Sequence, residues 1–139
     1  MTTSNFKILI IDTETEVISS VVSILKNEGF SVLTCSNSRE AIQLAVSNTP
    51  ELILVDLLMP EMDGIDICIE LRKKTELKNS LIVFHTARNE DYSQIAAFNA
   101  GADDYIIKPI KARVLISRLN ALLKRHSAHN KKAKIETGL

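Results

Sequence analysis

Residues 52–64 decide the fold, and they read LILVDLLMPEMDG. The stretch begins with four apolar residues, Leu52–Val55, places a carboxylate at Asp56, and continues into a turn that opens a helix. An apolar run of this length is typical of a strand that is covered on both faces of a parallel sheet. Such a strand carries Asp56 to the rim of the sheet, where open parallel sheets gather their reactive groups.

Three other strand-like runs also end in polar residues. They are Ile8–Ile11 before Asp12, Leu81–Phe84 before His85 and Thr86, and Tyr105–Ile107 before Lys108 and Pro109. Because the carboxyl ends of parallel strands meet at one edge of the sheet, we expect two acids, a hydroxyl and a lysine to share one crevice. His85 precedes Thr86, so strand alternation turns it to the opposite face, where a packed histidine is the favoured reading.

Five strand–helix units account for the chain. The strands begin near Lys7, Ser31, Leu52, Leu81 and Asp104, and each intervening segment is long enough for a helical crossover. Ser31–Cys35 mixes polar and apolar residues, which suits an edge strand. With right-handed crossovers, the predicted fold is α/β: a doubly wound, five-stranded parallel sheet of order 2-1-3-4-5, flavodoxin-like, with helices on both faces.

The apolar residues between the strands predict which side of each helix faces inward. For the first two helices these are Val17, Ile18, Val21, Val22, Ile24 and Leu25, ending near Gly29, then Ala41, Ile42, Ala45 and Val46 after a cap at Asn37 or Ser38. For the last three they are Ile65, Cys68, Ile69 and Leu71, then Ile95, Ala97 and Phe98 before Gly101, then Leu115, Leu119, Leu122 and Leu123.

Length and charge narrow the classes of protein. The 139 residues suffice for one domain, and 17 basic residues balance 17 acidic ones, so no basic field predicts nucleic acid or a membrane surface as a partner. Cys35 and Cys68 lack zinc-site spacing and are expected to be free thiols. Neither a secretory signal nor ~20 consecutive apolar residues occurs, so we expect a soluble cytoplasmic protein.

The expected domain spans residues 7–125, between a short tail at residues 1–6 and a polar tail at residues 126–139. Lys131, Lys132 and Lys134 make the second tail basic. A solvated linker or frayed end is favoured for it over an arm that binds nucleic acid.

Residues 7–125 resemble the receiver domain of two-component response regulators, on the strength of the strand-end residues quoted above. The resemblance implies that Asp56 is phosphorylated, that Thr86 bonds the phosphoryl group and that Lys108 pairs with it. It also implies a Mg²⁺ ion held by Asp12, Asp56 and the backbone carbonyl of Leu58, an aromatic switch residue at Tyr105, and a cis peptide bond at Lys108–Pro109. Oxygen ligands and retained waters suit Mg²⁺.

One position departs from that family, which has two adjacent acids after the first strand, whereas this chain has Asp12-Thr13. Three interpretations remain open: the metal binds more weakly, Glu14 reaches in with its longer side chain, or the domain signals without efficient phosphorylation. Because fewer charges at a cation site lower its affinity, we expect a raised magnesium requirement.

Other implications of the resemblance concern rate and assembly. Leu58 and Arg88 occupy positions that tune hydrolysis of the phosphoryl group in the family. Leu58 is apolar and unsuited to orienting water, which predicts a long-lived phosphoryl state. Residues 101–105 with Arg118 and Arg125 look most like receivers that precede DNA-binding domains and dimerise through helix four, strand five and helix five, although Gln94 stands where a basic residue is expected.

The leading functional hypothesis is a switch, not an enzyme with a diffusible substrate. A histidine kinase or phosphotransfer protein phosphorylates Asp56, the switch residues Thr86 and Tyr105 rearrange, and the face of helix four, strand five and helix five changes its partners. A phosphorylation-independent interaction module is the alternative. A small phosphatase of the haloacid dehalogenase type is a third, because residues 11–15, IDTET, faintly echo that family's motif. Glu14 replaces its second aspartate, and the chain has no room for a cap domain.

Overall fold

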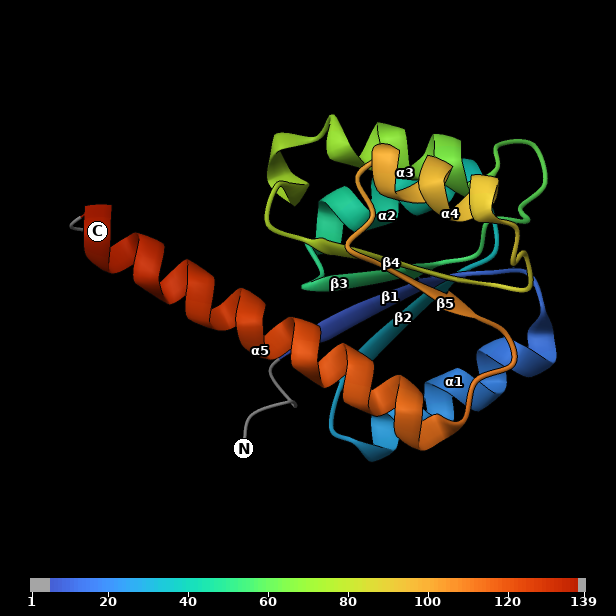
Figure 1. Cartoon of the computed structure of the whole chain (residues 1–139), viewed down its shortest axis with the longest axis horizontal. Helices are drawn as coiled ribbons and strands as arrows, with labels where there is room; N and C mark the ends of the chain where they lie inside the picture. Colours follow the sequence, from blue (N-terminus) through green and yellow to red (C-terminus); the bar gives the residue numbers. More distant parts are fainter. Residues whose placement is uncertain (1–5, 138–139) are drawn as a thin grey trace.

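The computed structural model describes the backbone of residues 6–137 and the side chains of residues 6–128. One sheet of five parallel strands has the order β2-β1-β3-β4-β5, as predicted (Figure 1). The strands are β1 (Lys7–Ile11), β2 (Ser31–Cys35), β3 (Leu52–Val55), β4 (Leu81–Thr86) and β5 (Asp104–Ile107). The helices are α1 (Thr15–Asn27), α2 (Ser38–Asn48), α3 (Gly64–Arg72), α4 (Asp91–Asn99) and α5 (Ala112–Thr137), with a 3-10 turn, η2 (Thr75–Leu77).

The sheet separates two hydrophobic cores. In Figure 1, α2, α3 and α4 cover one face, while α1 and α5 cover the other. Strand alternation sends Leu9 and Ile11 of β1 into the first core and Ile8 and Ile10 into the second. Every residue of β3 is buried, whereas β2 at the sheet edge is only partly buried, in keeping with its mixed sequence.

Local sequence explains several helix ends. The side chain of Asn37 caps α2 by accepting hydrogen bonds from the backbone N–H groups of Arg39 and Glu40. Gly29, two residues after the end of α1, has φ 95°, and Gly101, after α4, has φ 112°. Glycine takes this left-handed conformation without the steric cost that a side chain would add.

The predicted inward face of helix four is wrong for two of its three residues. Ile95 and Phe98 are 59% and 47% exposed, while Ala97 and Ser93 are buried. Apolar residues occur around most of α4, so the sequence period does not identify one face. Packing selects the small side chains, because they allow the helix to lie close to α3 and β5.

Helix three contains a similar correction. Ile69, expected inside, is 39% exposed, and Ile67, which was not predicted, is fully buried. Cys68 and Leu71 are buried as expected. Both cysteines are free thiols, and burial raises the pKa of Cys68 to about 11, so this thiol stays protonated near neutral pH.

Helix α5 continues to Thr137, well past the point near Arg125 where the apolar period stops. In Figure 1 its last turns extend away from the sheet. The side chains of Lys131, Lys132 and Lys134 lie outside the described residues, as do residues 1–5 of the expected N-terminal tail. Among the described helices, none combines the length and apolar character needed to span a membrane.

Candidate functional site

Two carboxylates follow neighbouring strands in the middle of the sheet. Asp12 comes directly after β1 and Asp56 directly after β3, and these strands pair in parallel. The backbone N–H of Asp56 continues the ladder by donating to the carbonyl of Ile11 at 2.9 Å. Both side chains are only 3% exposed. Two buried acids side by side repel each other, so their placement requires a cation.

Lys108, which follows β5, supplies a positive charge to this pair. Its ammonium donates to Asp12 Oδ2 at 2.9 Å, to Asp56 Oδ2 at 2.9 Å and to Glu14 Oε1 at 2.6 Å. Burial alone would lower the pKa of Lys108, but the hydrogen bonds to the three carboxylates outweigh burial and raise that pKa above its ordinary value. Lys108 is therefore charged throughout the physiological pH range.

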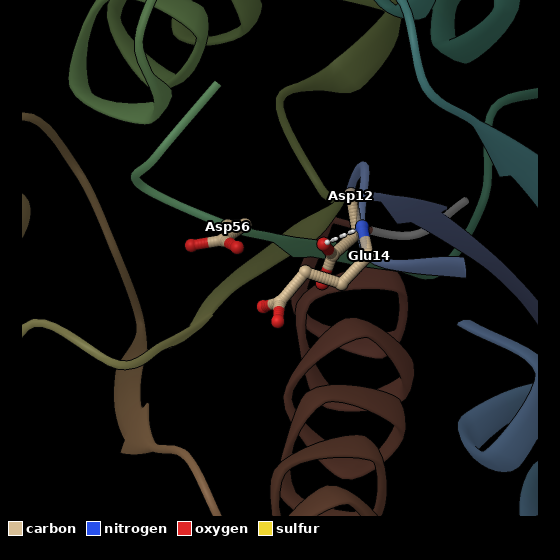
Figure 2. A group of neighbouring side chains, drawn as sticks. All are labelled: Asp12, Glu14 and Asp56. Carbon is tan, nitrogen blue, oxygen red and sulfur yellow. Dashed lines mark hydrogen bonds between the residues drawn. The ribbon is translucent and has the colours of Figure 1, made fainter. Parts of the chain in front are cut away.

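Glu14 enters the site from the residue before α1. The carboxylate of Asp12 accepts hydrogen bonds through Oδ1 from the backbone N–H groups of Thr13, at 2.7 Å, and Glu14, at 3.0 Å. This turn leaves Thr13 exposed and places the longer side chain of Glu14 over the crevice. Figure 2 shows the carboxylates of Asp12, Glu14 and Asp56 turned toward one shared space. Of the three interpretations of Thr13, the geometry supports the one in which Glu14 reaches in.

These three acids can hold a metal ion. One oxygen from each of Asp12, Glu14 and Asp56 lies within 4.8 Å of the others. An all-oxygen set of carboxylates fits a hard divalent cation. Leu58 was expected to add its carbonyl oxygen; its backbone N–H donates to Asp56 Oδ1 at 3.1 Å, and the carbonyl's role stays a prediction.

Thr86 is the last residue of β4, and Tyr105 lies in the neighbouring strand β5. Thr86 is fully buried, and its backbone carbonyl accepts a hydrogen bond from the N–H of Lys108 at 2.8 Å, which ties the two strand ends together. The hydroxyl of Tyr105 donates to the carbonyl of Arg88 at 2.8 Å, and its ring stacks on Phe84 with centroids 5.9 Å apart. Tyr105 thus connects the loop after Thr86 to the edge of the sheet. The peptide bond Lys108–Pro109 is cis.

Leu58 and Arg88 follow β3 and β4, and neither side chain is buried. Leu58 is 47% exposed. Arg88 donates through Nε to both carboxylate oxygens of Glu90, at 2.9 and 3.1 Å. Sequence reasoning did not single out Glu90, although an acid two residues after a basic residue at the start of a helix is a visible signal for such a pair.

Gly64 is a second residue whose importance the sequence did not reveal. It is the first residue of α3, and its N–H donates to the carbonyl of Leu57 at 2.8 Å. A Cβ atom at this position would lie 2.4 Å from the carbonyl oxygen of Asp56 and 2.7 Å from Cα of Leu57. Glycine allows α3 to begin directly against the backbone that holds Asp56.

His85 lies on the opposite face of β4 from Thr86, as strand alternation predicted. It is buried and lines a cavity of about 430 Å³ with residues of α1 and with Leu115. Burial lowers the pKa of His85, and the nearby charge of Lys108 lowers it further. The imidazole is therefore neutral near pH 7 and does not add positive charge to the acidic cluster.

Comparison with known proteins agrees with this geometry. The family described as "Response regulator receiver domain" matches residues 8–120. The chain is 40% identical over 119 residues to the transcriptional regulatory protein SrrA of Staphylococcus aureus. The matched residues cover 86% of this chain and 48% of that protein. The chain thus spans about half the length of that curated relative.

Solved structures give the same result. A two-component response regulator from Clostridium difficile superposes with a TM-score of 0.82 at 34% identity, covering 87% of this chain and 98% of the other. The BeF3-activated N-terminal receiver domain of Klebsiella pneumoniae RstA superposes with a TM-score of 0.79 at 28% identity, covering 84% and 97%.

Proposed function

Since the chain belongs to the response regulator receiver domain family, we propose that Asp56 accepts a phosphoryl group from a histidine kinase or a phosphotransfer protein. The chain spans about half of its SrrA relative, so its place in a longer regulator and its output are part of the proposal. The chain promotes its own modification and has no diffusible substrate to turn over.

The observation that carries this proposal is the contact of Lys108 with Asp56 beside Asp12. Asp56 is a nucleophile of the carboxylate type: one oxygen attacks phosphorus, an acyl phosphate bond forms, and the bond from phosphorus to the donor's imidazole nitrogen breaks. Lys108 is positioned to bind an oxygen of the transferred group, because its ammonium already lies 2.9 Å from Asp56 Oδ2. The hydroxyl of Thr86 is proposed to donate to a second phosphoryl oxygen.

We assign the metal site to Mg²⁺, held by Asp12, Asp56 and the carbonyl of Leu58. The donor set supports this assignment, since it consists of oxygens and carries negative charge. When bound, Mg²⁺ neutralises charge that develops on the phosphoryl oxygens. The protein residues keep the acids oriented: the backbone N–H of Leu58 fixes Asp56, and those of Thr13 and Glu14 fix Asp12.

Labelling with acetyl phosphate tests the proposed function. In the presence of Mg²⁺ the 139-residue chain should gain one phosphoryl group, visible as a mass increase, and a chelator should prevent the gain. Asp56→Asn should remove labelling completely, while Asp63→Asn, which changes the exposed acid that caps α3, should label like the unchanged chain. If the chain remains unlabelled at high magnesium, it acts as an interaction module instead.

The output surface is proposed to be the face formed by α4, β5 and α5. Large apolar side chains are exposed there, namely Tyr92, Ile95, Phe98, Ile107 and Val114. Exposed apolar groups that gather on one face are typical of interaction sites. This face is a candidate for homodimerisation, and Arg118 lies on it, where it pairs with Asp104 at 2.9 Å within the same chain. The Tyr105–Arg88 hydrogen bond links this face to the β4 end of the site.

We predict a slow loss of the phosphoryl group because the Leu58 side chain cannot hydrogen-bond an attacking water. Leu58→Asn should therefore speed the decay several-fold, since an amide at the mouth of the site can orient water. Phosphorylated chain, freed of acetyl phosphate, is followed over time by mass spectrometry. Ile69→Asn introduces the same amide in place of another exposed aliphatic side chain, on α3, and serves as the control. An unchanged decay rate in Leu58→Asn would refute this role for Leu58.

A further inference from the structure

The ammonium of Lys108 uses all of its hydrogen-bonding capacity on carboxylates. It has three N–H donors, and it contacts three acids, Asp12, Glu14 and Asp56, at 2.9, 2.6 and 2.9 Å. In this arrangement no donor remains for a phosphoryl oxygen. If Lys108 is to bind the phosphoryl group on Asp56, as the proposed function requires, one of its three present contacts must break.

Exposure identifies the contact that breaks most easily. The side chains of Asp12 and Asp56 are each 3% exposed, whereas that of Glu14 is 56% exposed. A buried carboxylate that loses its cation is left with a large desolvation cost, but Glu14 can return to water. Asp12 is also fixed by two backbone N–H groups and Asp56 by one, while Glu14 has Lys108 as its only side-chain partner in the described part of the chain.

The net charge of the cluster indicates what Glu14 could bind after it leaves Lys108. Three carboxylates and one ammonium carry a formal charge of −2, which a divalent cation balances; without Glu14 the sum is −1. Thr13 leaves the site one acid short of the family pattern, and Glu14 is the additional acid within 4.8 Å of Asp12 and Asp56. Its carboxylate can therefore serve either Lys108 or a cation held by the two aspartates.

We propose that Glu14 is an exchangeable carboxylate, which holds Lys108 while the site is free of cation and releases it to bind the cation, directly or through a water, in place of the acid missing at Thr13. This proposal rests on the proposed function. It makes cation entry the event that frees one N–H of Lys108 for the phosphoryl group. Binding of the cation and release of Lys108 are thereby coupled through the side chain of Glu14.

Cation binding can be measured without any phosphorylation, with Mn²⁺ as the probe, because it shares the preference of Mg²⁺ for carboxylate oxygens. Free Mn²⁺ is quantified by electron paramagnetic resonance in titrations of the 139-residue chain. Glu14→Gln should weaken binding about tenfold, the lower end of what supporting residues of metal sites contribute. Glu16→Gln, which removes the same charge from the exposed first turn of α1, should change affinity much less. Thr13→Asp should restore affinity in the Glu14→Gln chain.

A second measurement follows Lys108 itself. In a chain labelled with ¹⁵N at lysine, the Lys108 ammonium signal should shift when diamagnetic Mg²⁺ is added, and Glu14→Gln should move the cation-free signal toward that position. Equal Mn²⁺ affinity in Glu14→Gln and Glu16→Gln would overturn the exchange, and tighter binding in Glu14→Gln would show that Glu14 only restrains Lys108. Failure of the unchanged chain to bind Mn²⁺ at all would instead refute the proposed metal site.

Discussion

Replacing Lys108 with methionine should abolish phosphorylation by acetyl phosphate and lower the free energy of unfolding by about 3 kcal/mol, since removing one partner of a buried ion pair leaves the other charges uncompensated. The residues left behind are Asp12 and Asp56, both almost inaccessible to solvent. Urea denaturation near neutral pH in a chelator measures the loss. Mg²⁺ should reduce it, because the cation then takes the place of the ammonium between the two acids.

The pH dependence of this loss has a definite sign. The folded-state pKa of Lys108 lies above the ordinary value of 10.5, so its stabilisation is fully present below that value and is lost only as the pH rises through the folded-state pKa. At neutral pH the unchanged chain therefore has the full stabilisation that charged Lys108 provides.

Lys111→Met is the matched control, because Lys111 is exposed and three residues farther along the chain. It should retain both labelling and stability. If Lys108→Met unfolds at the same urea concentration as Lys111→Met, the three-acid contact does not stabilise the fold.

Gly64→Ala should also destabilise the protein by about 3 kcal/mol, the upper end of the usual cost of adding a methyl group to a packed site. The atoms that the new Cβ would meet, the carbonyl oxygen of Asp56 at 2.4 Å and Cα of Leu57 at 2.7 Å, belong to the backbone and cannot rotate away. The strand end must shift instead, which moves Asp56 relative to Lys108. We therefore expect the surviving folded protein to be phosphorylated much more slowly.

Gly101→Ala is the control that separates a displacement of Asp56 from a general loss of stability. Gly101 has φ 112° after α4, so alanine there is strained and should cost roughly 1 kcal/mol. The atoms nearest to a Cβ at this position belong to the side chain of Arg72, and none belongs to Asp56 or its neighbours. Labelling should therefore persist in Gly101→Ala. Equal labelling rates in the two alanine variants, at matched folded fractions, would contradict the role assigned to Gly64.

The sequence predicts the sheet and the meeting of the strand ends because both depend on simple, repeated signals. Uninterrupted apolar runs, such as Leu52–Val55, identify inner strands, and the mixed run Ser31–Cys35 identifies the edge. Once the strand order is known, parallel pairing requires the residues after β1, β3 and β5 to lie at one rim. The contacts of Lys108 with Asp12 and Asp56 confirm this reasoning.

Features that depend on side-chain packing or on the path of a turn could not be predicted from such patterns in the sequence. The nine residues of α4 have apolar groups on several sides, and the choice between Phe98 and Ala97 is made by the closeness of α3 and β5. The approach of Gly64 to the Asp56 carbonyl depends on the path of a turn, which residue type alone does not fix. Glu14 was one of three interpretations, and the turn built on Asp12 favours it.

The outward position of Tyr92, Ile95 and Phe98 has an evolutionary consequence. Side chains that remain in water contribute little to the free energy of folding, so mutations at these three positions are tolerated by the scaffold. The acids and the lysine at the rim belong to other structural elements than α4. Duplicated copies of this gene can thus diverge in the partner proteins that they bind through α4 and still keep the same residues at the site.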